Sequence, residues 1–197
     1  MITYLKGPIV TKDPTFLVID VGGIGYEVKI SLNTYGHLKD ADQTTLHTHL
    51  HIKEDSHTLF GFHEESEKKR FLDLISISGV GPSTALMVLS SLSAEELQSA
   101  IVNGDAKTIS SVKGIGQKTA QRIILELKDK MSKDDLLEKS SGISLIKGNT
   151  VKNEALSALA TLGINRAVAD KTIDKITKEY GDDISLEELI KLALKRA

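Results

Sequence analysis

The 197-residue chain contains no cysteine and no tryptophan, and its only aromatic residues are four tyrosines and four phenylalanines. The lack of cysteine excludes disulfides, thiolate metal sites and thiol catalysis, and it is typical of a protein from a reducing compartment. No run approaches the roughly 20 apolar residues that a membrane helix needs, and residues 1–10 lack a basic stretch that leads into a long apolar segment. The sequence therefore predicts a soluble, cytoplasmic protein without a membrane span.

The chain also lacks a basic excess, since 25 Lys and Arg face 27 Asp and Glu, for a net charge of −2. The acidic surplus lies entirely in residues 1–63, which hold five basic and seven acidic side chains, whereas the rest holds twenty of each. This balance argues against a protein that binds nucleic acid through a broad positive surface. It leaves open a local site made of backbone amides and a few well-placed basic side chains.

Residues 1–63 show the period-two pattern of short strands. Phe16 to Ile19 and Tyr26 to Ile30 flank a Gly-Gly turn, and residues 46–53 place apolar side chains at even positions and histidine or lysine at odd ones. Such a strand faces a core on one side and water on the other. Five or six strands with Gly-rich turns, and little helix signal before Glu64, predict a small antiparallel barrel.

Beyond residue 63 the hydrophobic period becomes that of helices. Phe71, Leu72 and Ile75 share a stripe, and helical runs follow at residues 86–92, 94–102 and 119–127. Residues 132–150 have no clear periodicity and are predicted to form a flexible linker. Three striped segments near residues 153–161, 166–178 and 185–195 predict a small three-helix domain, marginal on its own.

The most specific signal is an internal repeat. The segment Gly79-Val80-Gly81-Pro82-Ser83-Thr84-Ala85 recurs 35 positions later as Gly114-Ile115-Gly116-Gln117-Lys118-Thr119-Ala120. Each copy has an aliphatic residue two positions before its first glycine and an aliphatic stretch after its alanine. We therefore predict a unit of helix, short glycine loop and helix, in which the aliphatic residue between the glycines is tucked between the helices.

The repeated loop has the chemistry of a phosphate site. Free N–H groups and partial positive charge at a helix N-terminus suit a phosphate oxygen, and Pro82 at the first helical position removes no useful donor. Lys118 and Arg122 lie one turn apart and are expected to approach the same phosphate backbone. One Gly-x-Gly would be better explained as an ordinary turn, but two copies with matching Thr-Ala continuations are harder to dismiss.

Two nucleotide-binding motifs are disfavoured. Neither copy has the third glycine of a dinucleotide fingerprint, and neither follows a strand. The chain has no Gly-x-x-x-x-Gly-Lys-Ser/Thr, so a nucleotide-driven motor within it is not expected.

The repeated loops resemble tandem helix-hairpin-helix motifs, which hold duplex DNA through backbone amides without reading its sequence. With the barrel before them and the three helices after them, essentially all 197 residues resemble the RuvA family of Holliday-junction-binding subunits. The resemblance rests on residues 1–7, 21–28, 54–55, 59–62, 79–82 and 114–130. It implies an α+β multidomain protein with an OB-like barrel (1–63), a tandem helix-hairpin-helix domain (64–131), the linker (132–150) and a three-helix domain like ubiquitin-associated domains (151–197).

The resemblance also implies a function. Four or eight copies would assemble through the barrel and hold a four-way junction open and planar for branch migration in recombination and DNA repair, with no cofactor or metal and no catalysis of their own. The residues expected to grip minor-groove phosphates are Gly79, Val80, Gly81, Ser83, Thr84, Gly114, Ile115, Gly116, Lys118, Thr119 and Arg122. The sequence does not decide whether the assembly is a tetramer or an octamer, or whether the RuvC resolvase is a partner.

Glu54 and Asp55 lie where a hairpin turn is expected, and by themselves they are most simply solvated turn residues. Adjacent carboxylates could coordinate Mg²⁺, although no further acid nearby completes a site. The resemblance instead implies an acidic pin that repels phosphates and helps to separate strands at the crossover. Repulsion of about 1 kcal/mol per pair at about 4 Å in water can guide strands but cannot drive translocation.

The C-terminal domain is expected to dock the hexameric ATPase RuvB, which would supply ATP hydrolysis. The family's contacting motif falls on Leu159, Leu162 and Ile164. A flexible linker would suit this task, because a tethered module keeps its partner at high local concentration.

Several interpretations remain open. His47, His49 and His51 could form a metal ladder, but an exposed strand face explains them equally well, and near pH 6 they would add positive charge. Ser83 and Gln117 stand where the family often has lysine, which predicts a shallower salt dependence of DNA binding.

The rival functions are a structure-selective nuclease or glycosylase, which would need a catalytic lysine or a carboxylate cluster, and an RNA-binding protein, which would need more aromatics.

Overall fold

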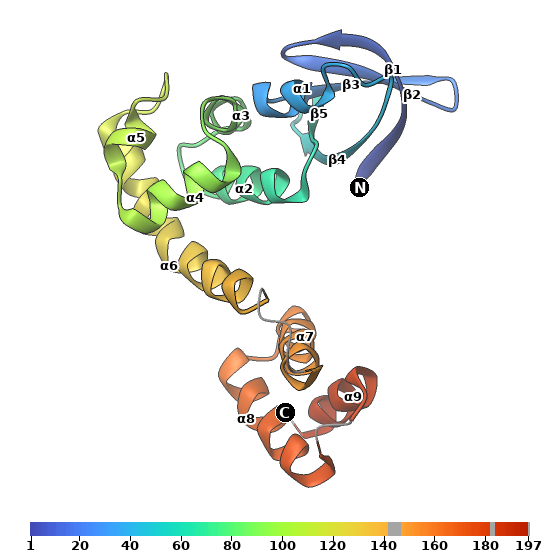
Figure 1. Ribbon diagram of the computed structural model, residues 1–197, viewed down its shortest axis with the longest axis vertical. Coiled ribbons are helices and arrows are strands. Elements are labelled where there is room, and N and C mark those ends of the chain that lie inside the picture. The colour runs from blue at the N-terminus through green and yellow to red at the C-terminus, as the bar shows by residue number, and fades with distance from the viewer. Residues whose placement is uncertain (142–146, 182–183, 197) are drawn as a thin grey trace. The chain divides into compact units, whose positions relative to one another are not determined.

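The computed structural model describes residues 1–141, 147–181 and 184–196 (Figure 1). The chain divides into two compact units, Met1–Glu138 and Lys139–Ala197. The first unit contains a β-barrel and a group of helices, and the second contains three helices. The predicted α+β fold is confirmed.

The barrel has five strands, β1 (Tyr4–Asp13), β2 (Phe16–Val21), β3 (Ile24–Ile30), β4 (Gln43–Ile52) and β5 (His57–Phe62). They close in the order β1-β2-β3-β5-β4. The prediction of a purely antiparallel barrel is wrong at one seam, because β3 pairs with β5 in parallel, with Val28 opposite Leu59. A parallel pair needs a crossover connection, and here α1 and β4 provide it.

The crossover contains a short helix that periodicity missed, α1 (Leu32–Leu38). Ser31 caps it, since its hydroxyl accepts a hydrogen bond from the Thr34 N–H at 3.0 Å. Seven residues are too few to show a helical stripe, and too few for a helix that is stable in isolation. The expectation of little helix before Glu64 is therefore corrected, and α1 depends on the contacts described below.

Five further helices follow the barrel: α2 (Glu65–Ile75), α3 (Pro82–Ser91), α4 (Ala94–Asn103), α5 (Ala106–Ser110) and α6 (Gln117–Ser141), of which α6 ends three residues beyond the first unit. Their buried stripes form one hydrophobic core, which Phe60 and Phe62 of β5 join. Because of this shared core, barrel and helices pack as a single unit. A capping box of Ser93 and Glu96 starts α4, and left-handed Gly104 ends it.

The predicted linker, residues 132–150, is helical at both ends. Helix α6 continues to Ser141, and α7 begins at Lys147. Residues 142–146 lie outside the described part of the chain, so a flexible tether there stays a prediction.

The second unit consists of α7 (Lys147–Thr161), α8 (Arg166–Tyr180) and α9 (Leu186–Arg196). Lys152 of α7 bridges two carboxylates of α8, with its Nζ 3.0 Å from Asp170 and 2.5 Å from Asp174. The core is formed by Ala155, Leu156, Leu159, Ala169, Ile173, Ile176, Leu189 and Ala193.

Across the described ranges, no single helix has the length and hydropathy needed to cross a bilayer. Helices α3 and α4 meet those criteria only when they are joined across a bend of 97°.

Candidate nucleic-acid interface

The two glycine loops have the same backbone geometry. In the first hairpin, Gly79 has a φ of 90°, the Val80 N–H donates to the Ile77 carbonyl at 3.0 Å, and the Ala85 N–H donates to the Gly81 carbonyl at 2.9 Å. The second hairpin repeats each feature 35 positions later: Gly114 with φ 89°, Ile115 N–H to Val112 O at 3.0 Å, and Ala120 N–H to Gly116 O at 2.9 Å. The sequence repeat is therefore also a structural repeat.

The aliphatic residue of each loop lies in the core, as predicted. Val80 is 4% exposed and Ile115 is 5% exposed, whereas the flanking glycines lie at the surface. This burial anchors each loop while its backbone faces outward. In the first hairpin the N-cap residue is Gly81, which has no side chain to cap the helix, so the first N–H groups of α3 are left for an external acceptor.

The two basic side chains that are expected to approach the same phosphate backbone lie at different loops. Lys118 is exposed in the first turn of α6, at its own hairpin. Arg122 instead reaches the first hairpin, where its Nη1 donates to the Ser78 carbonyl at 2.9 Å. Its other close partner is Glu126, 4.0 Å from Nε.

This crossing has a counterpart in the other direction. A Cβ built on Gly79 would lie 3.9 Å from Nη1 of Arg122, and one built on Gly114 would lie 4.0 Å from Sδ of Met87. Met87 and Arg122 are themselves 35 positions apart. The second helix of each hairpin thus places a side chain at the loop of the other hairpin. An approximate two-fold rotation would therefore exchange the two hairpins.

Glu54 and Asp55 occupy the turn between β4 and β5, and both are exposed. The turn is closed by the Lys53 N–H, which donates to the Ser56 carbonyl at 2.8 Å. The predicted turn is confirmed, and the role of the two carboxylates as a pin stays a prediction.

The histidine row does not form the solvated face that the alternation suggested. The His49 ring packs 5.8 Å from Phe71 of α2, and its Nδ1 is buried without a hydrogen-bond partner. Burial lowers the pKa of His49, and the nearby His51 and Lys68 lower it further. The expectation that all three rings gain charge near pH 6 is therefore corrected for His49, because α2 covers that side of β4.

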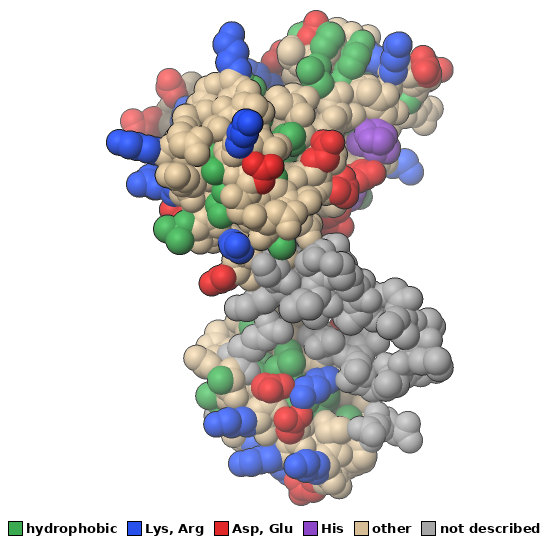
Figure 2. All heavy atoms as spheres, turned by 60° about the vertical axis from the view of Figure 1, so that its left-hand side comes forward, with side chains coloured by type: hydrophobic (Ala, Val, Ile, Leu, Met, Phe, Trp, Pro, Cys, Tyr) green, Lys and Arg blue, Asp and Glu red, His purple; other side chains and the backbone are tan. Residues whose placement is uncertain are grey.

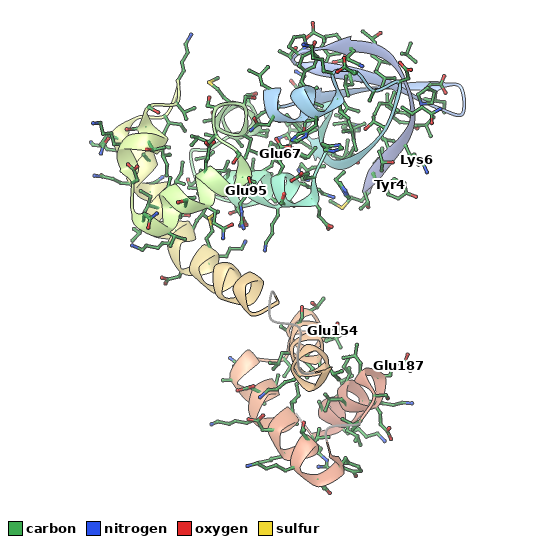
Figure 3. The ribbon with its side chains drawn as sticks, viewed as in Figure 1. Tyr4, Lys6, Glu67, Glu95, Glu154 and Glu187 are labelled. Carbon is green, nitrogen blue, oxygen red and sulfur yellow. The ribbon has the colours of Figure 1, made fainter. Side chains whose placement is uncertain are left out.

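A polar joint, formed by Ser31, Asn33, Thr34 and Glu67, holds the barrel against the hairpins. The buried Glu67 carboxylate of α2 accepts hydrogen bonds from the Ser31 hydroxyl and, at 2.7 Å, from the Thr34 hydroxyl. The Asn33 amide donates to two carbonyls at the end of α3, at 2.6 and 3.1 Å. Figure 3 shows Glu67 on α2 next to α1. Burial raises the pKa of Glu67 despite these hydrogen bonds.

The three residues expected to dock a partner are placed differently in the second unit. Leu159 is fully buried, and Ile164 is partly buried against the same core. Leu162 is 61% exposed, beside left-handed Gly163. Direct contact with a partner is therefore open to Leu162, while Leu159 supports the helix end from inside.

Charge on the first unit is mixed rather than gathered by sign. On the face shown in Figure 2, lysine and arginine side chains are interspersed with aspartate and glutamate. Within the described residues, no group of three or more His, Asp or Glu side chains is arranged to hold a metal ion.

Comparison with known proteins covers almost the whole chain. Residues 1–61 match the family model of the RuvA N-terminal domain, residues 71–129 match a SAM-like helix-hairpin-helix tandem, and residues 150–197 match the RuvA C-terminal domain. Three curated relatives are each named Holliday junction branch migration complex subunit RuvA. They come from Cytophaga hutchinsonii (55% identity; 99% of each chain), Christiangramia forsetii (51%; 100% of each) and Amoebophilus asiaticus (50%; 99% of this chain and 100% of the relative).

Proposed function

Because the chain belongs to the RuvA family, we propose that it is a Holliday junction branch migration complex subunit that binds four-way DNA and holds it in an open planar form. The observation that carries the proposal is the pair of helix-hairpin-helix loops with matching geometry. Their surface glycines let a phosphate approach the backbone closely, and the buried Val80 and Ile115 hold the loops rigid.

Binding of this kind needs no basic excess. Phosphate contacts from amides and a few cations position a protein on duplex DNA without reading its sequence. This agrees with a net charge of −2 and with the mixed charge of the surface in Figure 2. Assembly into a tetramer or octamer through the barrel would multiply the contacts made by each subunit.

The acidic turn fits a guiding role in such an assembly. Glu54 and Asp55 lie at the tip of a hairpin of the barrel, so copies arranged around a four-fold axis could present their carboxylates together to the strands. Carboxylates repel phosphates, so replacing them with the neutral pair Glu54→Gln/Asp55→Asn should tighten junction binding and change strand separation at the crossover. Unchanged affinity and unchanged strand opening would argue against the pin.

The subunit's role in the complex is DNA binding, and the RuvB motor supplies ATP hydrolysis. The sequence lacks the Gly-x-x-x-x-Gly-Lys-Ser/Thr loop with which nucleotide-driven motors bind phosphate. The second unit docks the motor through the exposed Leu162, and a RuvC resolvase is a further candidate partner.

Incubation of the protein with a labelled four-way junction and Mg²⁺ tests the proposal against a nuclease. An intact, shifted complex after incubation is the expected outcome. Metal-dependent cut products would overturn the proposal in favour of the structure-selective nuclease.

A further inference from the structure

The two hairpins differ in charge at equivalent positions. With the 35-residue offset of the repeat, Ser78 and Ser83 of the first hairpin correspond to Lys113 and Lys118 of the second. All four side chains are exposed. The second hairpin therefore has two lysines of its own where the first has two serines, and two loops of the same backbone geometry would meet a phosphate backbone with unequal charge.

A cation from another segment lies at the first of these serines. Arg122 of α6 donates from Nη1 to the Ser78 carbonyl, at 2.9 Å. The guanidinium has five N–H donors, and the side chain is 54% exposed, so it can bind a phosphate oxygen while it holds the loop.

A second cation lines the same groove as the other serine. An open groove of about 200 Å³ runs between the barrel and α3, and its lining includes both Ser83 and Lys29. Lys29 is an exposed residue of β3. Among the described residues that line the groove none is acidic, and Lys29 supplies its charge.

We propose that the first hairpin takes its positive charge from outside its own segment, from Arg122 at Ser78 and from Lys29 at Ser83, and that the groove between the barrel and α3 carries the phosphate backbone of the same duplex arm. This inference rests on the proposed function. It makes Lys29 a DNA-binding residue of the barrel. It also assigns Arg122, which belongs to the second hairpin by sequence, to the phosphate site of the first hairpin.

The salt dependence of junction binding tests the inference with the full chain. Removing one cation that binds a phosphate lowers the slope of log K against log salt by about 0.9. In the proposed platform four copies bind one junction, so Lys29→Gln removes about four such contacts. Between 50 and 200 mM salt the wild-type affinity should therefore fall about 150-fold more than that of Lys29→Gln, if each Lys29 binds one phosphate. Lys39→Gln is the matched control, because Lys39 is an exposed lysine of the same unit that does not line the groove.

A relocation of the charge makes the test specific. Since Ser83 has the place that Lys118 has in the second hairpin, the double variant Lys29→Gln/Ser83→Lys should regain the wild-type slope. At the other position, Arg122→Gln should lower the slope, and Arg122→Gln/Ser78→Lys should restore it.

The outcomes separate this inference from the function beneath it. If wild-type protein binds the junction but Lys29→Gln keeps the slope of Lys39→Gln, the inference is wrong and the proposed function stands. If wild-type protein does not bind four-way DNA, the proposed function itself fails.

Discussion

Alanine at Gly79 should destabilise the first unit clearly more than alanine at Gly81. Gly79 has a φ of 90°, where an L-residue is strained. The added methyl group itself would fit, because the nearest atom, Nη1 of Arg122, would lie 3.9 Å from it. Gly81 has a φ of −84° and a ψ of 167°, which any residue adopts, and no atom would lie within 4 Å of the new methyl group. The two substitutions therefore add the same methyl group and differ in backbone strain.

The magnitudes follow from that difference. A left-handed conformation costs an L-residue about 1–2 kcal/mol, so Gly79→Ala should destabilise the hairpin by about that amount, less the entropy removed from the unfolded chain. Gly81→Ala adds no strain, and the gain of about 0.4–1 kcal/mol from the less flexible unfolded state is offset because alanine is a poorer N-cap than glycine, so the net change should be close to zero. Gly114→Ala and Gly116→Ala should repeat this difference in the second hairpin, because Gly114 has a φ of 89° and Gly116 is not in the positive region.

Hydrogen exchange of one buried amide per hairpin measures these changes locally. The Ala85 N–H, bonded to the Gly81 carbonyl, reports on the first hairpin, and the Ala120 N–H reports on the second. Junction affinity should fall for Gly81→Ala even though the stability of the fold is nearly unchanged, because the methyl group would lie where a phosphate approaches. Equal losses of stability in the two variants, or full DNA affinity of the Gly81→Ala variant, would refute the reasoning.

Two further predictions concern the polar joint and the second unit. Because burial raises the pKa of Glu67, the folded state binds the proton more tightly than the unfolded state, so this group's contribution to stability is full below the unfolded pKa and is lost as pH rises through the folded pKa. Urea unfolding between pH 4 and 7 should therefore show Glu67→Gln gaining stability relative to wild type as pH rises, and parallel curves would contradict this. In the second unit, Leu162→Asp should change stability by less than about 0.5 kcal/mol yet abolish stimulation of the RuvB ATPase, whereas the buried control Leu159→Ala should cost about 2–5 kcal/mol. Normal stimulation by Leu162→Asp would remove that residue from the docking surface.

The parts of the fold that the sequence predicts correctly are those with a long local pattern. The strands of the barrel, the longer helices of both units and the buried positions of Val80 and Ile115 follow from periods of two and 3.6 and from the repeat. The short helix α1 could not be predicted in this way, because it depends on tertiary partners such as Glu67 and the end of α3. The parallel seam between β3 and β5 is likewise set by the crossover rather than by local pattern.

The candidate site shows the same division. The loops were predictable, but the position of Arg122 at the other hairpin depends on how two similar units pack. The sequence does contain a signal for this position, because Met87 and Arg122 occupy equivalent positions of the repeat. If the two hairpins pack with two-fold symmetry, each of these side chains lies at the loop of the other hairpin. The burial of His49 had no such signal, because alternation within one strand does not reveal that α2 covers it.

The central claim is that the paired hairpin loops bind DNA as part of a four-way platform. Affinity for a four-way junction and for a linear duplex of the same arm sequence, measured at one salt concentration, tests it most directly. The account predicts tighter binding of the junction, together with loss of that preference in Gly81→Ala/Gly116→Ala. Equal affinity for the two DNA forms would contradict it.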